Sequence, residues 1–185
     1  MSDTTAAEAK PEPVVVDRFC TLTYTDRLSP PTVRFADALL AGNFVGQKCP
    51  VCGRVYLPGK GYCPIDVVKM DERNEVPVAD QGTVTGFTII TPVRYYGQTK
   101  TEPFIYASVL LDGASSVLGG QEITGIPNDQ VRVGLRVRAV WKPEAERTLE
   151  GHSPRGWGSV EGSIDTFEWT GGPDAARETY EEFVI

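Results

Sequence analysis

The 185-residue chain contains a single histidine, His152, and this scarcity limits the chemistry it can perform. A Ser-His-Asp or Cys-His nucleophilic site would have to use that one imidazole. His152 lies in the segment Glu150 to Gly156, whose glycines and proline suit a loop more than a rigid site. The sequence therefore disfavours a self-sufficient acyltransferase or hydrolase, and we expect His152 to be an exposed or loop-packed side chain.

Long apolar runs and targeting signals are also missing. No stretch of about 18 apolar residues is present, so no membrane span is predicted. Residues 1–13 have neither the basic start nor the apolar centre of a secretory signal, and no Asn-x-Ser/Thr sequon occurs. Clustered cysteines in such a chain indicate a metal in a reducing compartment, not disulfides. We predict a cytoplasmic protein.

Basic residues are outnumbered by acidic ones. The chain has 18 Lys and Arg against 25 Asp and Glu, which gives a net charge of −7 and a pI near 4.8. Nucleic acids are bound chiefly through Lys and Arg at the phosphates, so this balance disfavours nucleic acid as the main partner. A local basic patch on an acidic protein would still allow it.

Three of the four cysteines lie in one 18-residue window. Cys49-Pro-Val-Cys52-Gly53 is followed by Cys63-Pro-Ile-Asp66, so two short turns each offer ligands three residues apart. Zn²⁺ favours four tetrahedral ligands, and paired turns of this kind supply them in zinc ribbons. We predict a rubredoxin-like zinc ribbon with the ligands Cys49, Cys52, Cys63 and Asp66.

Asp66 stands where a fourth thiolate would be expected, and it leaves alternatives open. A weakly bound Asp66 would mimic the open position of catalytic zinc, but ribbons lie outside their domains and no general base is near, so we favour structural zinc. A metal-free ribbon is the other alternative, since these ligands leave a charge of −2 and Val67 suits a tight turn less than Gly53. Cys20 could replace Asp66 only if the N-terminal arm folded back, and we expect it to pack as a small apolar side chain.

The chain is expected to fold as a mainly β protein with five successive parts. Residues 1–13 are polar and predict a disordered tail. Residues 14–43 form an arm and a short helix, 44–70 the zinc ribbon and 71–170 a five-stranded barrel. Residues 171–185 are an acidic tail, which is either a docking segment or loose.

The helix and strands follow from apolar spacing and turn residues. Val33, Phe35, Ala36, Leu39 and Leu40 recur at helical spacing after Pro31, and Gly42 is a plausible stop. Five β-branched or aromatic segments follow, with a short non-strand stretch around Pro127 between the third and the fourth. This order predicts an OB-fold, a Greek-key barrel. The predicted strands are Thr83 to Thr91, Phe104 to Leu111, Ser116 to Gly120, Arg136 to Trp141 and Ser163 to Trp169.

Several sequence blocks resemble the family named domain of unknown function 35. They are Phe44 to Arg54 with Leu57-Pro58 and Cys63-Pro64, then Gly82 to Thr88, Pro103 to Ala107 and Val133 to Val137. The resemblance covers residues 31 to 170 and implies an N-terminal helix, a rubredoxin-like zinc ribbon and a C-terminal OB-fold. The family has a fourth Cys where this chain has Asp66.

The resemblance also implies an accessory role in lipid or steroid metabolism. Family members resemble partners of thiolase-superfamily enzymes, including sterol-carrier-type thiolases and aldolases. In that arrangement the OB-fold helps to bind or channel an acyl-CoA, and the partner supplies the reactive group.

Two loops are expected to overhang the barrel and to carry the ligand site, because OB-folds bind with such loops. Arg and Lys could hold the CoA phosphates and an aromatic ring could stack on adenine. The alternative is solvated charges and aromatics that close the barrel ends. Loop 92–102 carries Arg94, Tyr95, Tyr96 and Lys100, and loop 142–162 carries Arg147, Arg155 and Trp157; the acyl-CoA candidates are Arg94, Tyr96, Lys100, Arg155 and Trp157.

We therefore expect a non-catalytic subunit that binds a thiolase-superfamily enzyme in a hetero-oligomer and helps to position an acyl-CoA. The apolar helix face (Phe35, Leu39, Leu40) and the ribbon are the expected contact surfaces. The alternative is a nucleic-acid-binding zinc-ribbon and OB-fold module, because OB-folds also stack bases on aromatic side chains.

Overall fold

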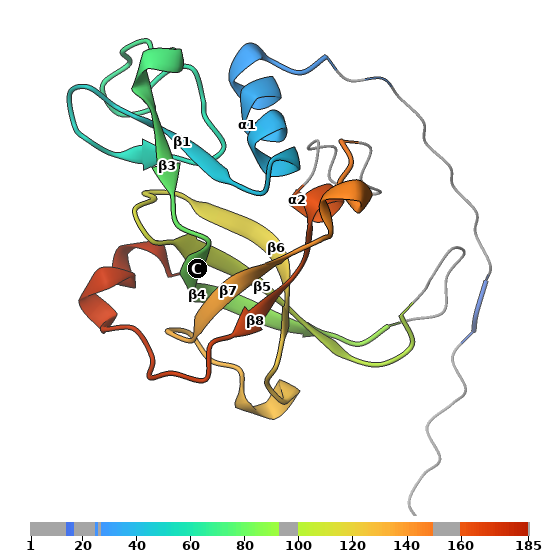
Figure 1. Cartoon of the computed structure of the whole chain (residues 1–185). Helices are drawn as coiled ribbons and strands as arrows, with labels where there is room; N and C mark the ends of the chain where they lie inside the picture. Colours follow the sequence, from blue (N-terminus) through green and yellow to red (C-terminus); the bar gives the residue numbers. More distant parts are fainter. Residues whose placement is uncertain (1–13, 17–24, 26, 93–99, 150–159, 185) are drawn as a thin grey trace, which may run out of the picture.

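The computed structural model describes residues 14–16, 25, 27–92, 100–149 and 160–184. Within them the chain forms an N-terminal helix, a three-stranded sheet and a closed five-stranded barrel, with the helix and small sheet together at one end of the barrel (Figure 1). The predicted fold class, mainly β with one helix of several turns and an OB-like barrel, is confirmed. No helix in the described part of the chain is long and apolar enough to cross a membrane.

Helix α1 spans Pro30–Leu40 with Ala41 as its C-cap, and the predicted stop residue Gly42 follows directly. Gly42 adopts a left-handed φ of 78°, and its N–H donates to the Leu39 carbonyl while the Asn43 N–H donates to the Ala38 carbonyl. This pair of bonds is a Schellman motif, which glycine favours because it has no Cβ to clash.

The apolar face of α1 is buried within the chain itself. Phe35 and Leu39 are 5% and 1% exposed, and both belong to the main hydrophobic core. The expectation that this face contacts a partner is therefore wrong for Phe35 and Leu39, whereas Leu40 is half-buried. Helical spacing identified the apolar side but could not show that the neighbouring sheet and barrel would cover it.

The small sheet has the order β2-β1-β3, with β1 at Phe44–Lys48, β2 at Val55–Tyr56 and β3 at Glu75–Val78. Strand β3 follows the 3₁₀ turn η1 at Glu72–Asn74 and pairs with β1 from Phe44↔Val78 to Gln47↔Glu75. This strand lies beyond residue 70, where the sequence predicted the ribbon to end. Its Pro77 is tolerated because β3 is an edge strand.

The barrel has the strand order β4-β5-β6-β8-β7 and closes through pairing of β7 with β4. The β6 and β8 pair is parallel and the others are antiparallel. Short 3₁₀ turns, η2 (Asn128–Gln130) and η3 (Glu144–Glu146), and the one-turn α2 (Val160–Ser163) connect the later strands. The strands are β4 (Gln81–Ile90), β5 (Phe104–Leu111), β6 (Val117–Thr124), β7 (Arg136–Trp141) and β8 (Ile164–Trp169).

All five predicted strands are present, but the third is longer than predicted. Strand β6 continues past Gly120 to Thr124. Gly119 and Gly120 lie opposite the single residue Ser108, and Gly120 has a φ of 70°, so the glycine pair forms a β-bulge. Glycines that look like the end of a strand can also mark such an irregularity inside one.

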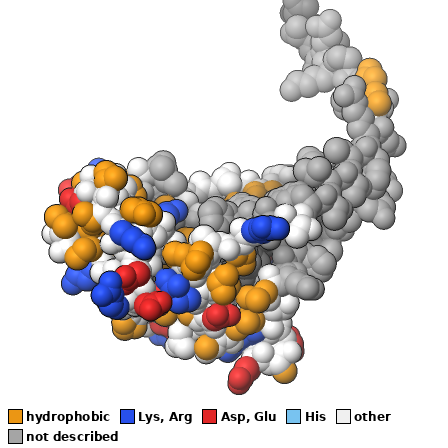
Figure 2. Space-filling view, turned by 90° about the horizontal axis from the view of Figure 1, so that it is seen from above, with side chains coloured by type: hydrophobic (Ala, Val, Ile, Leu, Met, Phe, Trp, Pro, Cys, Tyr) orange, Lys and Arg blue, Asp and Glu red, His pale blue; other side chains and the backbone are white. Residues whose placement is uncertain are grey.

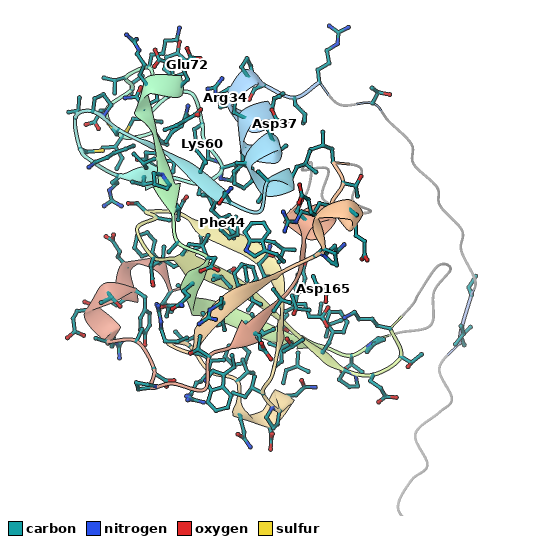
Figure 3. All side chains as sticks on the ribbon, viewed as in Figure 1. Arg34, Asp37, Phe44, Lys60, Glu72 and Asp165 are labelled. Atoms are coloured by element: carbon teal, nitrogen blue, oxygen red, sulfur yellow. The ribbon has the colours of Figure 1, made fainter. Side chains whose placement is uncertain are left out.

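Helix, small sheet and barrel share one hydrophobic core. Phe44 of β1 packs between the small sheet and the barrel, with its ring centroid 5.0 Å from that of Trp141 (Figure 3). Hydrogen bonds add to this joint, since Ser116 Oγ accepts from the Leu57 N–H at 2.8 Å and donates to the Leu57 carbonyl at 3.0 Å. The ribbon is thus rigidly attached to the barrel.

The described part of the acidic tail, residues 171–184, packs on this chain and is not loose. It contains the turns η4 (Arg177–Thr179) and η5 (Glu181–Phe183). The Ala175 N–H donates to the Gly134 carbonyl at 2.9 Å, and Arg132 forms a two-pronged ion pair with Asp174. A Cβ on Gly134 would lie 2.8 Å from the Tyr180 hydroxyl, so this glycine allows the tail to approach.

Candidate metal centre

Two turns of the small sheet have the same backbone pattern. In the first knuckle, residues 49–54, the Cys49 N–H donates to the Arg54 carbonyl and the Gly53 N–H to the Cys49 carbonyl, at 2.8 and 3.1 Å. In the second knuckle, residues 63–68, equivalent bonds at 2.9 and 3.0 Å involve Cys63, Val67 and the carbonyl of residue 68. The two turns therefore present their side chains in equivalent ways.

The structure brings the four predicted side chains together. The potential ligand atoms of Cys49, Cys52, Cys63 and Asp66 all lie within 4.8 Å of one another. The sulfurs of Cys52 and Cys63 are 3.7 Å apart, and Asp66 Oδ2 lies 3.1 Å from Cys49 Sγ and 3.2 Å from Cys63 Sγ. A tetrahedral Zn²⁺ with its usual bond lengths would set these separations at about 3.8 Å and about 3.5 Å. The cluster can therefore hold a metal ion after small adjustments of the carboxylate.

Cys49 and Cys63 are each 1% exposed, and Tyr56 and Met70 pack beside them in a small second core. Cys52 is exposed, so one edge of the site reaches the surface. Backbone amides support the sulfurs, because the Val51 N–H lies 3.4 Å from Cys49 Sγ and the Asp66 N–H 3.4 Å from Cys63 Sγ. Such amides compensate the negative charge of bound thiolates.

The electrostatics favour an ionised carboxylate among the thiols. Hydrogen bonds from Cys52, Cys49 and Cys63 lower the pKa of Asp66. The same carboxylate raises the pKa of Cys52 to about 12. Burial by itself would raise the pKa of Cys63, but the Asp66 amide and the Tyr56 hydroxyl lower it below its usual value. A metal that binds here must displace thiol protons, so its affinity decreases as the pH is lowered.

Gln47 is a structural part of the site that the sequence reasoning missed. Its side chain is 1% exposed; Oε1 accepts from the Gly61 N–H at 2.8 Å and Nε2 donates to the Asp71 carbonyl at 3.5 Å. These bonds fix the segment that leads into Cys63. A Cβ on Gly59 would lie 2.8 Å from Gln47, so the turn needs glycine there. An amide in a strand just before the first Cys was the available signal.

Of the predicted acyl-CoA residues, only Lys100 lies in the described part of the chain. Its ammonium group pairs with Glu122 and stands 4.7 Å above the centre of the Phe104 ring. The remaining four candidates lie outside the described residues: Arg94, Tyr96, Arg155 and Trp157. Cys20, Tyr95 and His152 also lie outside them.

Arg147, expected on the late ligand loop, has a structural role. Its Nη1 donates to the Leu40 carbonyl at 3.1 Å and its Nε to the Lys142 carbonyl at 2.9 Å. The guanidinium also stands 5.7 Å from the centre of the Trp141 ring. Arg147 therefore caps the C-terminus of α1 and fixes the helix to the barrel.

A crevice of about 400 Å³ lies where the α1–β1 turn and β3 face β7. Its lining includes Trp141 and Asp80. Neither residue was predicted as part of a site, because the crevice exists only through the joining of ribbon and barrel. It is lined by Ala38, Gly42, Asn43, Phe44, Val45, Pro77, Val78, Asp80 and Trp141.

Comparison with known proteins gives a consistent result. Residues 75–142 match the family model described as the ChsH2 C-terminal OB-fold domain. A DUF35 domain-containing scaffold protein of Methanocaldococcus jannaschii is 26% identical over 98 residues, which are 53% of this chain and 67% of that protein.

Two solved structures share the fold. A DUF35-family protein of unknown function from Sulfolobus solfataricus has 26% identity and a TM-score of 0.50, over 60% of this chain and 78% of that one. A structure described as the Ltp2-ChsH2(DUF35) aldolase has 22% identity and a TM-score of 0.50, over 65% of this chain and 92% of that one. With the barrel and the blocks of sequence described above, these matches support a DUF35-family protein with an OB-fold.

Proposed function

We propose that this chain is a non-catalytic subunit that binds a thiolase-superfamily enzyme and helps to hold its acyl-CoA substrate. The similarity to DUF35-family proteins carries the proposal. One relative is named a scaffold protein, and one structure of the same fold is named as an aldolase assembled from Ltp2 and ChsH2. The partner would supply the reactive side chain, and we expect both proteins to act in the cytoplasm.

We further propose that Cys49, Cys52, Cys63 and Asp66 bind structural Zn²⁺. Four side chains converge on one point, and a structural zinc site is closed by four protein ligands, whereas a catalytic site keeps a position for water. The ion would hold the two knuckles together at the tip of the ribbon.

We propose that the acyl-CoA binds to the two loops expected at the barrel rim, 92–102 and 142–162. Lys100 would have to exchange Glu122 for a phosphate, and Arg94, Tyr96, Arg155 and Trp157 would complete the site. The crevice next to Trp141 supports this location, because Trp141 immediately precedes the late loop and its ring could contact an adenine or acyl group.

The test is co-expression of the full chain with a thiolase-superfamily enzyme from the same organism. We expect the two proteins to co-purify at a fixed ratio, and turnover of acyl-CoA to fall when this chain is left out. Arg94→Ala and Arg155→Ala should weaken CoA retention by the complex, with exposed Glu178→Ala on the far tail as a control.

Two results would contradict the proposal. Thioester conversion by the purified chain alone would show that it is itself an enzyme. Salt-sensitive capture of a single-stranded oligonucleotide, without any effect on the neighbouring enzyme, would favour the nucleic-acid alternative.

A further inference from the structure

We infer that the tips of the two knuckles form a docking surface for a protein with an acidic rim around an apolar centre. This knuckle face consists of Val51, Tyr62, Ile65 and Val67, whose exposed fractions are 66%, 57%, 59% and 77%. The identity of the partner as an enzyme rests on the proposed function, and the inference adds the surface to which that partner binds.

The knuckle face gathers exposed apolar side chains on a small, rigid element. Val51 lies in the first knuckle, and Ile65 and Val67 in the second, while Tyr62 immediately precedes Cys63. The backbone hydrogen bonds of both turns and the cysteine cluster fix their positions. Scattered exposed apolar residues are ordinary, but a preorganised group of them is typical of an interaction site.

Val67 gives an independent indication. Its φ is 55°, the left-handed region that a β-branched residue rarely adopts, whereas the equivalent position of the first knuckle is Gly53 with a φ of 74°. The Val67 side chain is 77% exposed, so its packing within this chain does not compensate the strain. Strained residues of this kind concentrate at functional sites, and a partner that covers the isopropyl group would supply the missing contact.

The charge of the ribbon indicates the chemistry of that partner. Residues 44–78 contain five Lys and Arg against four Asp and Glu, a net charge of +1, while the rest of the chain carries −8. With three ionised thiols and a bound divalent ion the ribbon would be neutral, in contrast to the acidic remainder of the chain. Figure 2 looks onto this end of the molecule, where apolar side chains lie among Lys and Arg, with Asp and Glu between them. The basic residues are Lys48, Arg54, Lys60, Lys69 and Arg73.

A basic rim around an apolar centre fits a protein surface with complementary charge. A nucleic acid would be bound by a dense basic stripe with stacking rings. Here three of the four central side chains are aliphatic, and Arg73 is paired with Asp71. The surface therefore favours a protein over a nucleic acid.

The first experiment locates the contact by photo-crosslinking inside cells of the organism that produces the protein. A benzophenone amino acid replaces Val51 or Ile65 in the full chain, and the matched control carries it at Ile89, an apolar residue of β4 that is 41% exposed. We expect irradiation to link one protein at both knuckle positions and not at the control. Equal linking at Ile89, no linking at the knuckles, or linking to nucleic acid would overturn the inference.

The second experiment measures the affinity of the purified full chain for the linked protein. Val67→Gly and Ile65→Ser should each weaken binding at least about tenfold, while Ile89→Ser changes it less than about twofold. Association should slow as salt rises. Val67→Gly should also raise the midpoint of unfolding, so loss of binding cannot be attributed to loss of folding.

The outcomes separate this inference from the proposed function. If the linked protein is a thiolase-superfamily enzyme and the knuckle variants weaken its binding, both are supported. If another protein is linked and responds to the same variants, the docking surface stands and the proposed enzyme partner is wrong. If a thiolase-superfamily enzyme binds equally well to all variants, the docking surface is wrong and the proposed function stands.

Discussion

Val67 and Gly53 occupy the same left-handed backbone position in the two knuckles. Exchanging valine and glycine between these positions measures the free-energy cost of the strained backbone conformation. Val67 is mostly exposed, and a Cβ on Gly53 would meet no atom within 4 Å, so neither Val67→Gly nor Gly53→Val changes much packing. A left-handed residue with a Cβ costs about 1 to 2 kcal/mol relative to glycine. The greater freedom of glycine in the unfolded chain offsets about 0.5 to 1 kcal/mol of that.

We therefore expect Val67→Gly to stabilise the isolated chain by about 0.5 to 1 kcal/mol and Gly53→Val to destabilise it by a similar amount. For a chain of this size the midpoint of thermal unfolding should move by about 1 to 4 °C in each direction. The double exchange should lie near the wild type, because the two turns are equivalent.

The assay is chemical and thermal unfolding of the isolated chain, with Zn²⁺ at one fixed excess for all variants, since a bound ion shifts apparent stability. An unchanged slope with denaturant would show that only stability has changed. If Val67→Gly lowered the free energy of unfolding, Val67 would have to make stabilising contacts within the chain, and the strain argument would fail.

Three further results are expected. Asp66→Ala should lower metal affinity at least about tenfold in competition with a chromophoric chelator, and unchanged affinity would remove Asp66 from the ligand set. Leu39→Ala should reduce the free energy of unfolding by about 2 to 5 kcal/mol, because its side chain is 1% exposed in the shared core; a loss below about 1 kcal/mol would mean that the helix packs loosely. Hydrogen bonds from Arg73 lower the pKa of Asp71 to about 2, so its contribution to stability is present above the ordinary pKa near 4 and is lost as the pH falls towards 2. Asp71→Asn keeps a capping side chain but should flatten that part of the acid unfolding curve, and identical curves would contradict the assignment.

Features that depend on local sequence patterns were predicted well. The strands Phe104–Leu111 and Arg136–Trp141 have the predicted bounds, because β-branched and aromatic residues there are enclosed by turn residues. The helix stop at Gly42 was predicted because a left-handed C-terminal residue favours glycine. Ligand spacing likewise predicted that Cys49 and Asp66 would converge, since a tight knuckle leaves little conformational freedom.

Features that depend on contacts distant in sequence were not predictable. Strand β3 contains Glu75 and Pro77 and has only four residues, so it gives no alternating pattern, and its pairing with β1 decides its structure. The covering of Leu39 and the capping of Leu40 by Arg147 both require the ribbon and barrel to be joined. Loop charges such as Lys100 could be placed on a loop, but not paired with Glu122.

The joint between ribbon and barrel determines what the knuckle face can do. Ser115 and Ser116, which precede β6, bond to Val55 and Leu57 of the ribbon, and Arg54 of the first knuckle pairs with Glu182 of the tail. The ribbon is therefore held by bonds from two distant segments as well as by the core. A partner docked on the knuckle face would hold the barrel rim in one orientation relative to itself. Because fixed orientation is how a subunit without reactive groups can aid another enzyme's chemistry, rigidity of this joint is as necessary to the proposed function as the docking contacts themselves.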